Sequence, residues 1–353
     1  MIIDWFVHKP KKPEQVFAID LGLKTIKATY FERKGNSYHL TNFAIVESDG
    51  CVASLNLDGL TEKLRNISKS IDSKTKQVIF GLGVSSVLLR QADLPMVPVS
   101  ELRQLLKISP KTYFQQDMPD YEYDCFILSG KTPAEKESER PQTKCRVIIG
   151  AAKKQILEFV QSAAKSAGLV ASEITSTTVG PFNAIEMTMP EVFQKECIAC
   201  VDLGYKFSSI TISNSGDWVL NRVVAIGAEK VINTLAESLN VSITEAESNL
   251  LNAPQDVETA LIHPISYLGR ELRASIDFFE HNYDKPVNQV LFGGGMARSQ
   301  FILQAIQTEL QSPCSAINPS SYFAVGLEAS KIAELEQCAP QLVPSIGIAA
   351  GVM

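Results

Sequence analysis

The sequence lacks the features of a membrane-spanning or secreted protein. It has no apolar run of the roughly 18 residues that a transmembrane helix needs. Residues 1–15 contain no signal-peptide core. Hydrophobic residues make up 45% of the chain and charged residues 20%, which is typical of a folded globular protein. We therefore expect the chain to be cytoplasmic.

The sequence also lacks the residues that several classes of ligand or cross-link would need. The formal net charge is −6, so there is no electrostatic reason to expect a nucleic-acid partner. The four histidines are scattered and form no zinc-hydrolase motif. Seven cysteines at irregular spacing make no disulfide framework, and the C-x-x-C at Cys197 and Cys200 has no second pair to complete a zinc ribbon. Both cysteines are expected to be small core residues.

What the sequence does have is an internal repeat. FAIDLGLKTIKATYF (17–31) aligns without gaps on ACVDLGYKFSSITIS (199–213), which places Asp20 on Asp202 and Gly22 on Gly204. Each segment is typical of a strand, a turn and a second strand. A single turn of this kind means little, because Asp and Gly are common turn residues. The same turn at the start of each half predicts a duplicated fold.

The repeated turn has the chemistry of a phosphate site. Glycine lets the backbone turn tightly and bring N–H groups close to an anion. An adjacent carboxylate suits a divalent cation that lies between it and the phosphate, held through water. Two such hairpins facing each other would hold a polyphosphate from both sides, with Mg²⁺ bound through water by Asp20 and Asp202. A pair of ordinary β-turns is the alternative.

A third element fits the same site. In NQVLFGGGMARSQFILQAIQTEL (288–310), a buried strand leads into a turn of three glycines and then into a helix. Such a unit lets a ligand approach the backbone and a helix N-terminus, so we expect the adenosine end of a nucleotide there. Elsewhere strands and helices alternate, as in α/β proteins. Residues 131–144 are expected to form an exposed hairpin loop, and SITEAESNLL begins with a capping box at Ser242 and Glu245.

These elements together resemble the actin-like ATPase fold and, within it, the PilM family, the FtsA-like proteins of type IV pilus assembly. The resemblance runs from about Val16 to Val352. It includes LLRQADLPMVPVSELRQLLKI, which is similar to an inserted subdomain, RELRASIDFFEH ahead of the glycine turn, and the terminal PSIGIAAGV.

The resemblance implies an α/β protein of two duplicated halves in four subdomains. Subdomain 1A would be 16–84, completed by about 325–353, and the inserted subdomain 1C would be 85–170. Subdomain 2A would be 171–227, completed by about 286–324, and 2B would be 228–285.

The function implied is that of a cytoplasmic nucleotide-binding scaffold in a type IV pilus or related secretion machine. It would bind the N-terminal cytoplasmic tail of a PilN-like bitopic inner-membrane protein, and so lie at the inner face of the cytoplasmic membrane. Motor or platform proteins of the pilus are further partners that the resemblance implies, and self-association is open. The cofactors would be ATP or ADP with Mg²⁺.

The repeat and the resemblance together give a set of candidate nucleotide-binding residues: Asp20, Gly22, Lys24, Thr25, Lys27, Asp202, Gly204, Lys206, Ser208, Gly227, Lys230, Glu271, Gly294, Gly295 and Met296. Apolar residues on the insertion exceed what one packed face needs. They predict a partner groove involving Leu88, Arg90, Leu102 and Leu105, although the same leucines would equally fill the core of the insertion.

The phosphate loops depart from the family pattern. The first is usually D-I-G-S-S-S-x-K but here contains Leu23 and Lys24, and the second is enlarged by Tyr205 and Lys206. No residue is identified as a hydrolytic base, so we expect at most a slow ATPase.

Two other functions on this fold are kept as alternatives, an FtsA-like division protein and a small-molecule kinase. The chain has neither a terminal amphipathic membrane helix, as FtsA does, nor a convincing acceptor-site aspartate, as a kinase needs. Membrane anchoring by Trp5 and Phe6 with Lys9, Lys11 and Lys12 also stays open.

Overall fold

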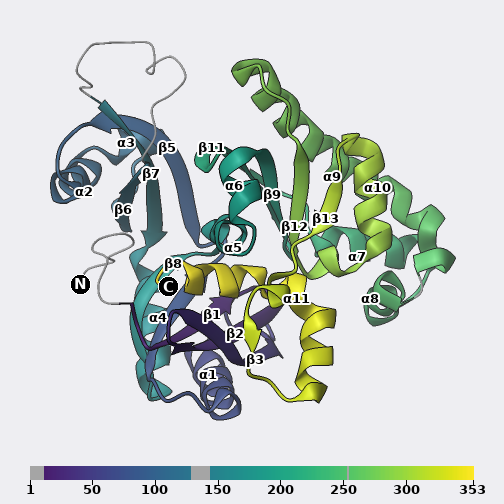
Figure 1. Ribbon diagram of the computed structural model, residues 1–353, viewed down its shortest axis with the longest axis horizontal. Helices are drawn as coiled ribbons and strands as arrows, with labels where there is room; N and C mark the ends of the chain where they lie inside the picture. The colour runs from purple at the N-terminus through teal and green to yellow at the C-terminus, as the bar shows by residue number, and fades with distance from the viewer. Residues whose placement is uncertain (1–11, 129–143, 253) are drawn as a thin grey trace.

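The computed structural model describes residues 12–128, 144–252 and 254–353, which form three β-sheets with helices packed on them (Figure 1). Two sequence predictions fall outside this range. These are the anchoring residues Trp5, Phe6, Lys9 and Lys11, and the hairpin loop apart from Lys144.

A six-stranded sheet forms the first half. Its order is β14 (Ala324–Val325), β3 (Ser37–Glu47), β2 (Thr25–Lys34), β1 (Gln15–Leu21), β4 (Gln77–Leu82) and β8 (Val170–Ser176). Helices α1 (Leu57–Ile71) and α4 (Lys154–Ser166) cover one face. Helix α1 buries Leu60, Leu64, Ile67 and Ile71, whose spacing puts them on one side of a helix.

A five-stranded sheet forms the second half. Its order is β11 (Asp217–Val224), β10 (Ser208–Asn214), β9 (Cys197–Leu203), β12 (Gln289–Gly294) and β13 (Cys314–Ala316). The helices packed on one face are α7 (Ala228–Leu239), α8 (Ile243–Asn252), α9 (Pro254–Tyr283) and α10 (Gln300–Leu310). Cys197 and Cys200 are buried in β9, and burial raises the pKa of both thiols, so they are core residues as expected.

The insertion is a three-stranded sheet between β4 and α4. Its order is β5 (Val87–Pro95), β7 (Lys144–Lys153) and β6 (Tyr121–Ile127), with α2 (Val99–Ile108) and α3 (Pro110–Phe114) on one side. It has its own core, in which Leu94, Leu102, Leu106 and Ile149 are fully buried. It also touches the second half, where Ile148 packs with Trp218 of β11.

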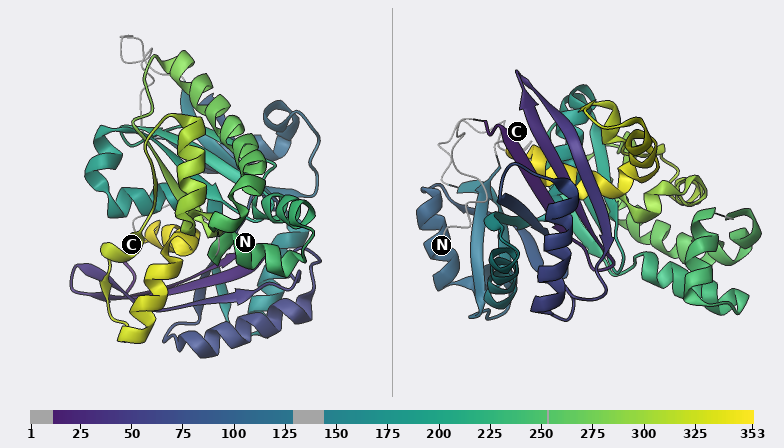
Figure 2. Two further views of the ribbon diagram at one scale, coloured as in Figure 1. Left: turned by 90° about the vertical axis from the view of Figure 1, so that its right-hand side faces the viewer. Right: turned by 90° about the horizontal axis from the view of Figure 1, so that it is seen from below.

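Two helices lie between the large sheets and join the halves. Helix α5 (Gly180–Thr188), followed by α6 (Pro190–Lys195), packs on the second sheet. Helix α11 (Ala329–Ala350), yellow in Figures 1 and 2, contacts both sheets. The two helices cross at Gly180 and Gly347, where a Cβ on Gly347 would overlap the backbone of Gly180. Glycine is therefore needed for this close approach.

The described residues also contain three short 3₁₀ helices: η1 (Thr177–Val179), η2 (Gly295–Arg298) and η3 (Pro319–Ser321).

The predicted subdomain boundaries can be compared with the observed elements. Helix α4 packs on α1, and β8 pairs with β4, so residues 154–176 lie against the first sheet. The prediction had put α4 with the insertion and most of β8 with the second half. The four-subdomain division itself stays a prediction.

Candidate functional site

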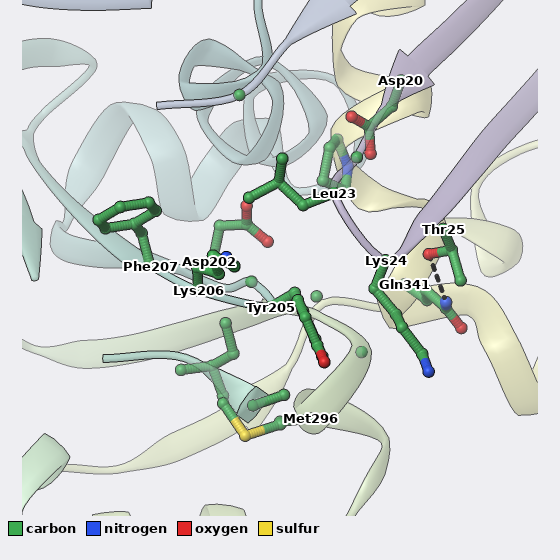
Figure 3. Close-up of a pocket in the computed structure, with 18 of the residues that line it drawn as sticks. Asp20, Leu23, Lys24, Thr25, Asp202, Tyr205, Lys206, Phe207, Met296 and Gln341 are labelled. Carbon is green, nitrogen blue, oxygen red and sulfur yellow. Dashed lines mark hydrogen bonds between the residues drawn. The ribbon is translucent and has the colours of Figure 1, made fainter. Parts of the chain in front are cut away.

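A cavity of about 410 Å³ lies between the two repeated hairpins (Figure 3). Its wall includes Asp20–Lys24 of the first hairpin, Asp202–Phe207 of the second and Gly294–Met296 of the glycine turn, with further residues from α7, α8 and α11. The volume is within the usual range for small-molecule sites, roughly 300–1,000 Å³.

The two hairpins hold their aspartates in equivalent places. Asp20 is the second-last residue of β1, and its neighbour on the parallel strand β4 is Gly81. Asp202 is likewise the second-last residue of β9, and its neighbour on the parallel strand β12 is Gly293. In each loop a Cβ on the glycine after the aspartate would meet the carbonyl oxygen three residues further on, for Gly22 and Gly204 alike. The repeat in the sequence is therefore a repeat in backbone geometry.

The two hairpins differ in the residue that is paired with each aspartate on the neighbouring strand. Asp20 faces Lys27 on β2, and the Lys27 Nζ donates to Asp20 Oδ2 at 2.9 Å with both side chains largely buried. Asp202 faces Ser209 on β10, and its carboxylate makes no hydrogen bond or ion pair with the described residues. Loss of water around Asp202 raises its pKa to about 6; Asp20 adds to this shift, and Lys27 opposes it.

The glycine turn brings backbone close to the second aspartate. Gly294 has φ +95°, and a Cβ there would lie 2.8 Å from Asp202 Oδ1. A side chain at this position would therefore be strained and would also crowd the carboxylate. A Cβ on the next residue, Gly295, would meet no atom within 4 Å, so there is open space at this point of the turn.

Four side chains gather on the outer wall of the cavity. Lys24 Nζ lies 3.2 Å from Glu247 Oε2 of α8 and 3.8 Å from Glu47 Oε2 of β3. It also lies 5.9 Å from the ring centre of Tyr205. Figure 3 shows the Lys24 and Tyr205 side chains reaching into the same space from opposite hairpins. The larger residues in these loops therefore contact each other.

Eleven of the fifteen candidate nucleotide residues line the cavity: Asp20, Gly22, Lys24, Thr25, Lys27, Asp202, Gly204, Lys206, Gly294, Gly295 and Met296. The other four are not part of its wall. Ser208 is buried and donates to the Ile226 carbonyl at 2.7 Å, whereas its neighbour Ser209 lines the cavity. Gly227 caps α7, and Lys230 is exposed one turn later. Glu271 pairs with Arg222 at 3.0 Å.

The wall also contains residues that the sequence analysis did not predict. Gly83, Val84 and Ser85 follow β4 and correspond in place to the glycine turn that follows β12. The similarity of QVIFGLG (77–83) to QVLFGGG (289–295) could have revealed this turn. Thr177, Glu247 and Gln341 reach the cavity from η1, α8 and α11, and Gln341 Nε2 donates to Thr25 Oγ1 at 3.3 Å. No local sequence pattern marks these three.

The candidate groove residues on the insertion separate into two groups. Leu102 is fully buried in the core of the insertion, and Leu105 is half-buried. Leu88 and Arg90 are exposed on β5. The side chains of Leu88 and Arg90 are therefore accessible to a partner, whereas that of Leu102 is packed in the core of the insertion and is not accessible.

The described residues were also compared with what a metal cluster or a membrane-spanning helix requires. In this part of the chain no three His, Cys, Asp or Glu side chains come together as a metal-binding group. Of the acids and amides on the cavity wall, Asp20, Glu47, Glu247 and Gln341 each pair with another side chain. Within residues 12–128, 144–252 and 254–353, no helix combines the length and apolar character needed to cross a membrane.

Comparison with known proteins identifies the family. The family model described as type IV pilus assembly protein PilM matches residues 18–351. A chain of the PilM–PilN type IV pilus biogenesis complex superposes with a TM-score of 0.80 at 18% identity, covering 97% of this chain and 99% of that one. The ethanolamine utilization protein EutJ from Carboxydothermus hydrogenoformans gives a TM-score of 0.57 at 13% identity, covering 97% and 91%. No curated protein matched the chain.

Both the predicted fold and the predicted family are confirmed. The solved structures share the arrangement of two sheet-and-helix halves over nearly the whole length, which is the actin-like ATPase fold. Such low identity is evidence for the fold alone, but the family model covers almost all of the sequence. The chain therefore belongs to the family of the type IV pilus assembly protein PilM.

Proposed function

We propose that this chain is a scaffold of type IV pilus assembly that binds a nucleotide between its two halves and a PilN-like tail on its insertion. The observation that carries the nucleotide part is the pair of equivalent hairpins, whose Asp20 and Asp202 lie on one cavity. Family membership carries the assembly role. The FtsA-like and kinase alternatives have no comparable support.

The phosphates would lie between the two D-L-G turns. Backbone N–H groups of both turns would bind phosphate oxygens, as in other anion-binding concavities. Lys27 would supply positive charge from the buried end, while Lys24 and Lys206 would supply it from the outer side. Ile232, Leu250 and Met296 form an apolar wall beside the glycine turn, where the adenine base would lie.

The fit to Mg²⁺ differs between the two aspartates. Asp20 is already neutralised by Lys27 at 2.9 Å, whereas Asp202 has no such partner. Protein-bound Mg²⁺ usually keeps several waters and uses one or two carboxylates together with substrate phosphates. Asp202 would thus hold the ion through water, which would screen charge on the phosphates.

Catalysis would be slow, because no acid or amide on the described wall is both unpaired and placed to orient water, apart from Asp202 itself. Phosphoryl transfer in such a site depends on positioning and on charge stabilisation. The main role of bound ATP would then be to control the conformation of the protein, and little of it would be hydrolysed.

The partner proposal rests on the insertion. One of the solved relatives is a PilM–PilN complex, and here β5 carries the exposed Leu88 and Arg90. Extended tails commonly bind to sheet edges and apolar grooves by backbone pairing with side-chain pockets. A PilN-like tail would attach the chain to the inner face of the cytoplasmic membrane. Contact with motor or platform proteins, and self-association, are further parts of this proposal.

Titration calorimetry with ATP and Mg²⁺ tests the nucleotide part. The unmodified protein should bind, and Asp202→Ala should weaken binding at least about tenfold, a loss of roughly 1.4 kcal/mol. Asp217→Ala, which changes a β11 residue outside the cavity wall, is the matched control and should bind normally. The absence of binding by the unmodified protein would show that the altered loops have lost the site.

A further inference from the structure

The ion pair between Lys24 and Glu247 connects the two halves across the cavity. Lys24 belongs to the first hairpin, and Glu247 to α8 in the second half, 223 residues away in the sequence. The Lys24 Nζ lies 3.2 Å from Glu247 Oε2. The same ammonium group lies 3.8 Å from Glu47 Oε2 of the first half and 5.9 Å from the centre of the Tyr205 ring of the second half.

The pair lies at the outer end of the cavity. The Lys24 and Glu247 side chains are each 35% exposed, whereas those of Asp20 and Lys27 are 5% and 14% exposed. All four line the same cavity. The exposure therefore rises from the buried Asp20–Lys27 pair to the Lys24–Glu247 pair, which places the second pair at the entrance.

Lys24 is held as a cation in this position. Partial burial lowers its pKa, but the hydrogen bond and charge of Glu247, together with Glu47, outweigh this and leave the pKa above its ordinary value. Helix α8 is itself anchored at its start, because the Glu245 N–H donates to Ser242 Oγ at 3.2 Å. The pair therefore joins two well-defined elements.

A bound polyphosphate would compete for the same ammonium group. Lys24 follows the D-L-G turn by two residues, so phosphates held by the backbone of that turn would lie within reach of its side chain. A phosphate chain carries several negative charges against one on Glu247. Once Lys24 turns to the phosphates, the Glu247 carboxylate is left facing negative charge and is repelled.

We propose that the Lys24–Glu247 pair is a latch that holds α8 against the first hairpin in the empty protein and is released by the phosphates of a bound nucleotide. This inference rests on the proposed nucleotide site and adds to it a conformational response. Release would free the lobe of α7 and α8 to move relative to the first half, which would make the shape of the scaffold depend on the nucleotide.

The test has two parts, both with the full chain. The first is a double-mutant cycle of Lys24→Met and Glu247→Gln in urea unfolding of the nucleotide-free protein. A partly exposed pair predicts a coupling of about two- to fivefold in the unfolding equilibrium constant. Additive effects would show that no latch exists, whatever the protein binds.

The second part measures the affinity for a fluorescent ATP analogue with Mg²⁺. Glu247→Gln should bind about three- to tenfold more tightly than the unmodified protein, because Lys24 is freed and the repulsion is removed. In a Lys24→Met background the same change should have a smaller effect. Glu245→Gln, on the same helix but outside the cavity wall, is the control and should bind like the unmodified protein.

The outcomes separate this inference from the proposed function. Binding by the unmodified protein with no gain in Glu247→Gln would overturn release by nucleotide and leave the nucleotide site standing. No binding by the unmodified protein would contradict both the site and the release, while the unfolding cycle would still report whether the pair couples the halves.

Discussion

The two aspartates show how one residue type serves two purposes in duplicated positions. Asp20 is buried in an ion pair with Lys27 that has no net charge. The main role of Asp20 in the nucleotide-free protein is therefore structural. Asp202 faces Ser209, and its charge is not balanced by a partner at hydrogen-bond distance. An unbalanced carboxylate in a cavity costs stability, which is the usual condition of residues that await a ligand.

This asymmetry predicts a pH-dependent stability difference for Asp202→Asn in the absence of Mg²⁺. Folding raises the pKa of Asp202 from 3.8 to about 6, so its stabilising contribution is full below about pH 3.8 and is lost as the pH rises through 6. Asparagine mimics the protonated form. The variant should therefore be more stable at pH 8 by up to roughly 3 kcal/mol, and the difference should shrink towards pH 4.

Urea unfolding at pH 8 and pH 4.5 measures this difference. Asp117→Asn, at an exposed position on the insertion, should show no comparable dependence on pH. An Asp202→Asn variant that is less stable than the unmodified protein at pH 8 would mean that the fold stabilises the ionised carboxylate, contrary to this account.

At the scale of the elements, the β-hairpins and the glycine turn were predictable because each is a continuous stretch with its own pattern. The repeat predicted Asp20 and Asp202, and its alignment places Lys27 on Ser209, but the sequence analysis named Ser208 instead. The pairing of Ser209 with Asp202 decides which serine faces the cavity, and an error of one residue moves a strand side chain to the other face.

Residues brought in by tertiary packing could not be predicted in this way. Gln341 reaches Thr25 from 316 positions away because α11 crosses between the sheets. The position of Glu247 on the cavity wall likewise depends on where α8 packs. On the insertion, the sequence showed an excess of leucines but not which ones its core takes up, and Leu102 proved to be buried.

The crossing of α5 and α11 predicts that Gly347→Ala is severely destabilising. The added methyl group would overlap the Gly180 backbone, and neither helix can shift freely between two sheets. We expect a loss of at least about 2 kcal/mol in the free energy of unfolding. Gly351→Ala, where the methyl group would meet the Asn183 side chain, is the control and should be tolerated. Equal stability of the two variants would refute this packing.

The insertion predicts opposite outcomes for two leucine substitutions. Leu88→Asp changes an exposed position on β5 and should abolish capture of a PilN-like tail peptide while the protein still unfolds cooperatively. Leu102→Asp puts a charge into a fully buried site and should destabilise the insertion by several kcal/mol. A pull-down combined with thermal melting separates the two effects. Normal capture by a folded Leu88→Asp variant would place the tail elsewhere.

For the whole molecule, we expect a scaffold whose shape responds to nucleotide. Two halves joined by α5 and α11 enclose the cavity, and the Lys24–Glu247 pair lies at its partly exposed outer end. Steady-state ATP turnover should stay below roughly 1 s⁻¹, the lower end of ordinary enzymes. A purified sample that hydrolyses tens of ATP per second, with Asp202→Ala inactive in parallel, would show that the chain is an enzyme.

The central claim is that a nucleotide binds between the two repeated hairpins. A crystal structure with Mg²⁺ and a non-hydrolysable ATP analogue tests it most directly. We expect density for the phosphates between residues 22–24 and 204–206, with the base beside Met296. Density for the analogue at another place, or an empty cavity at a saturating concentration of the analogue, would contradict it.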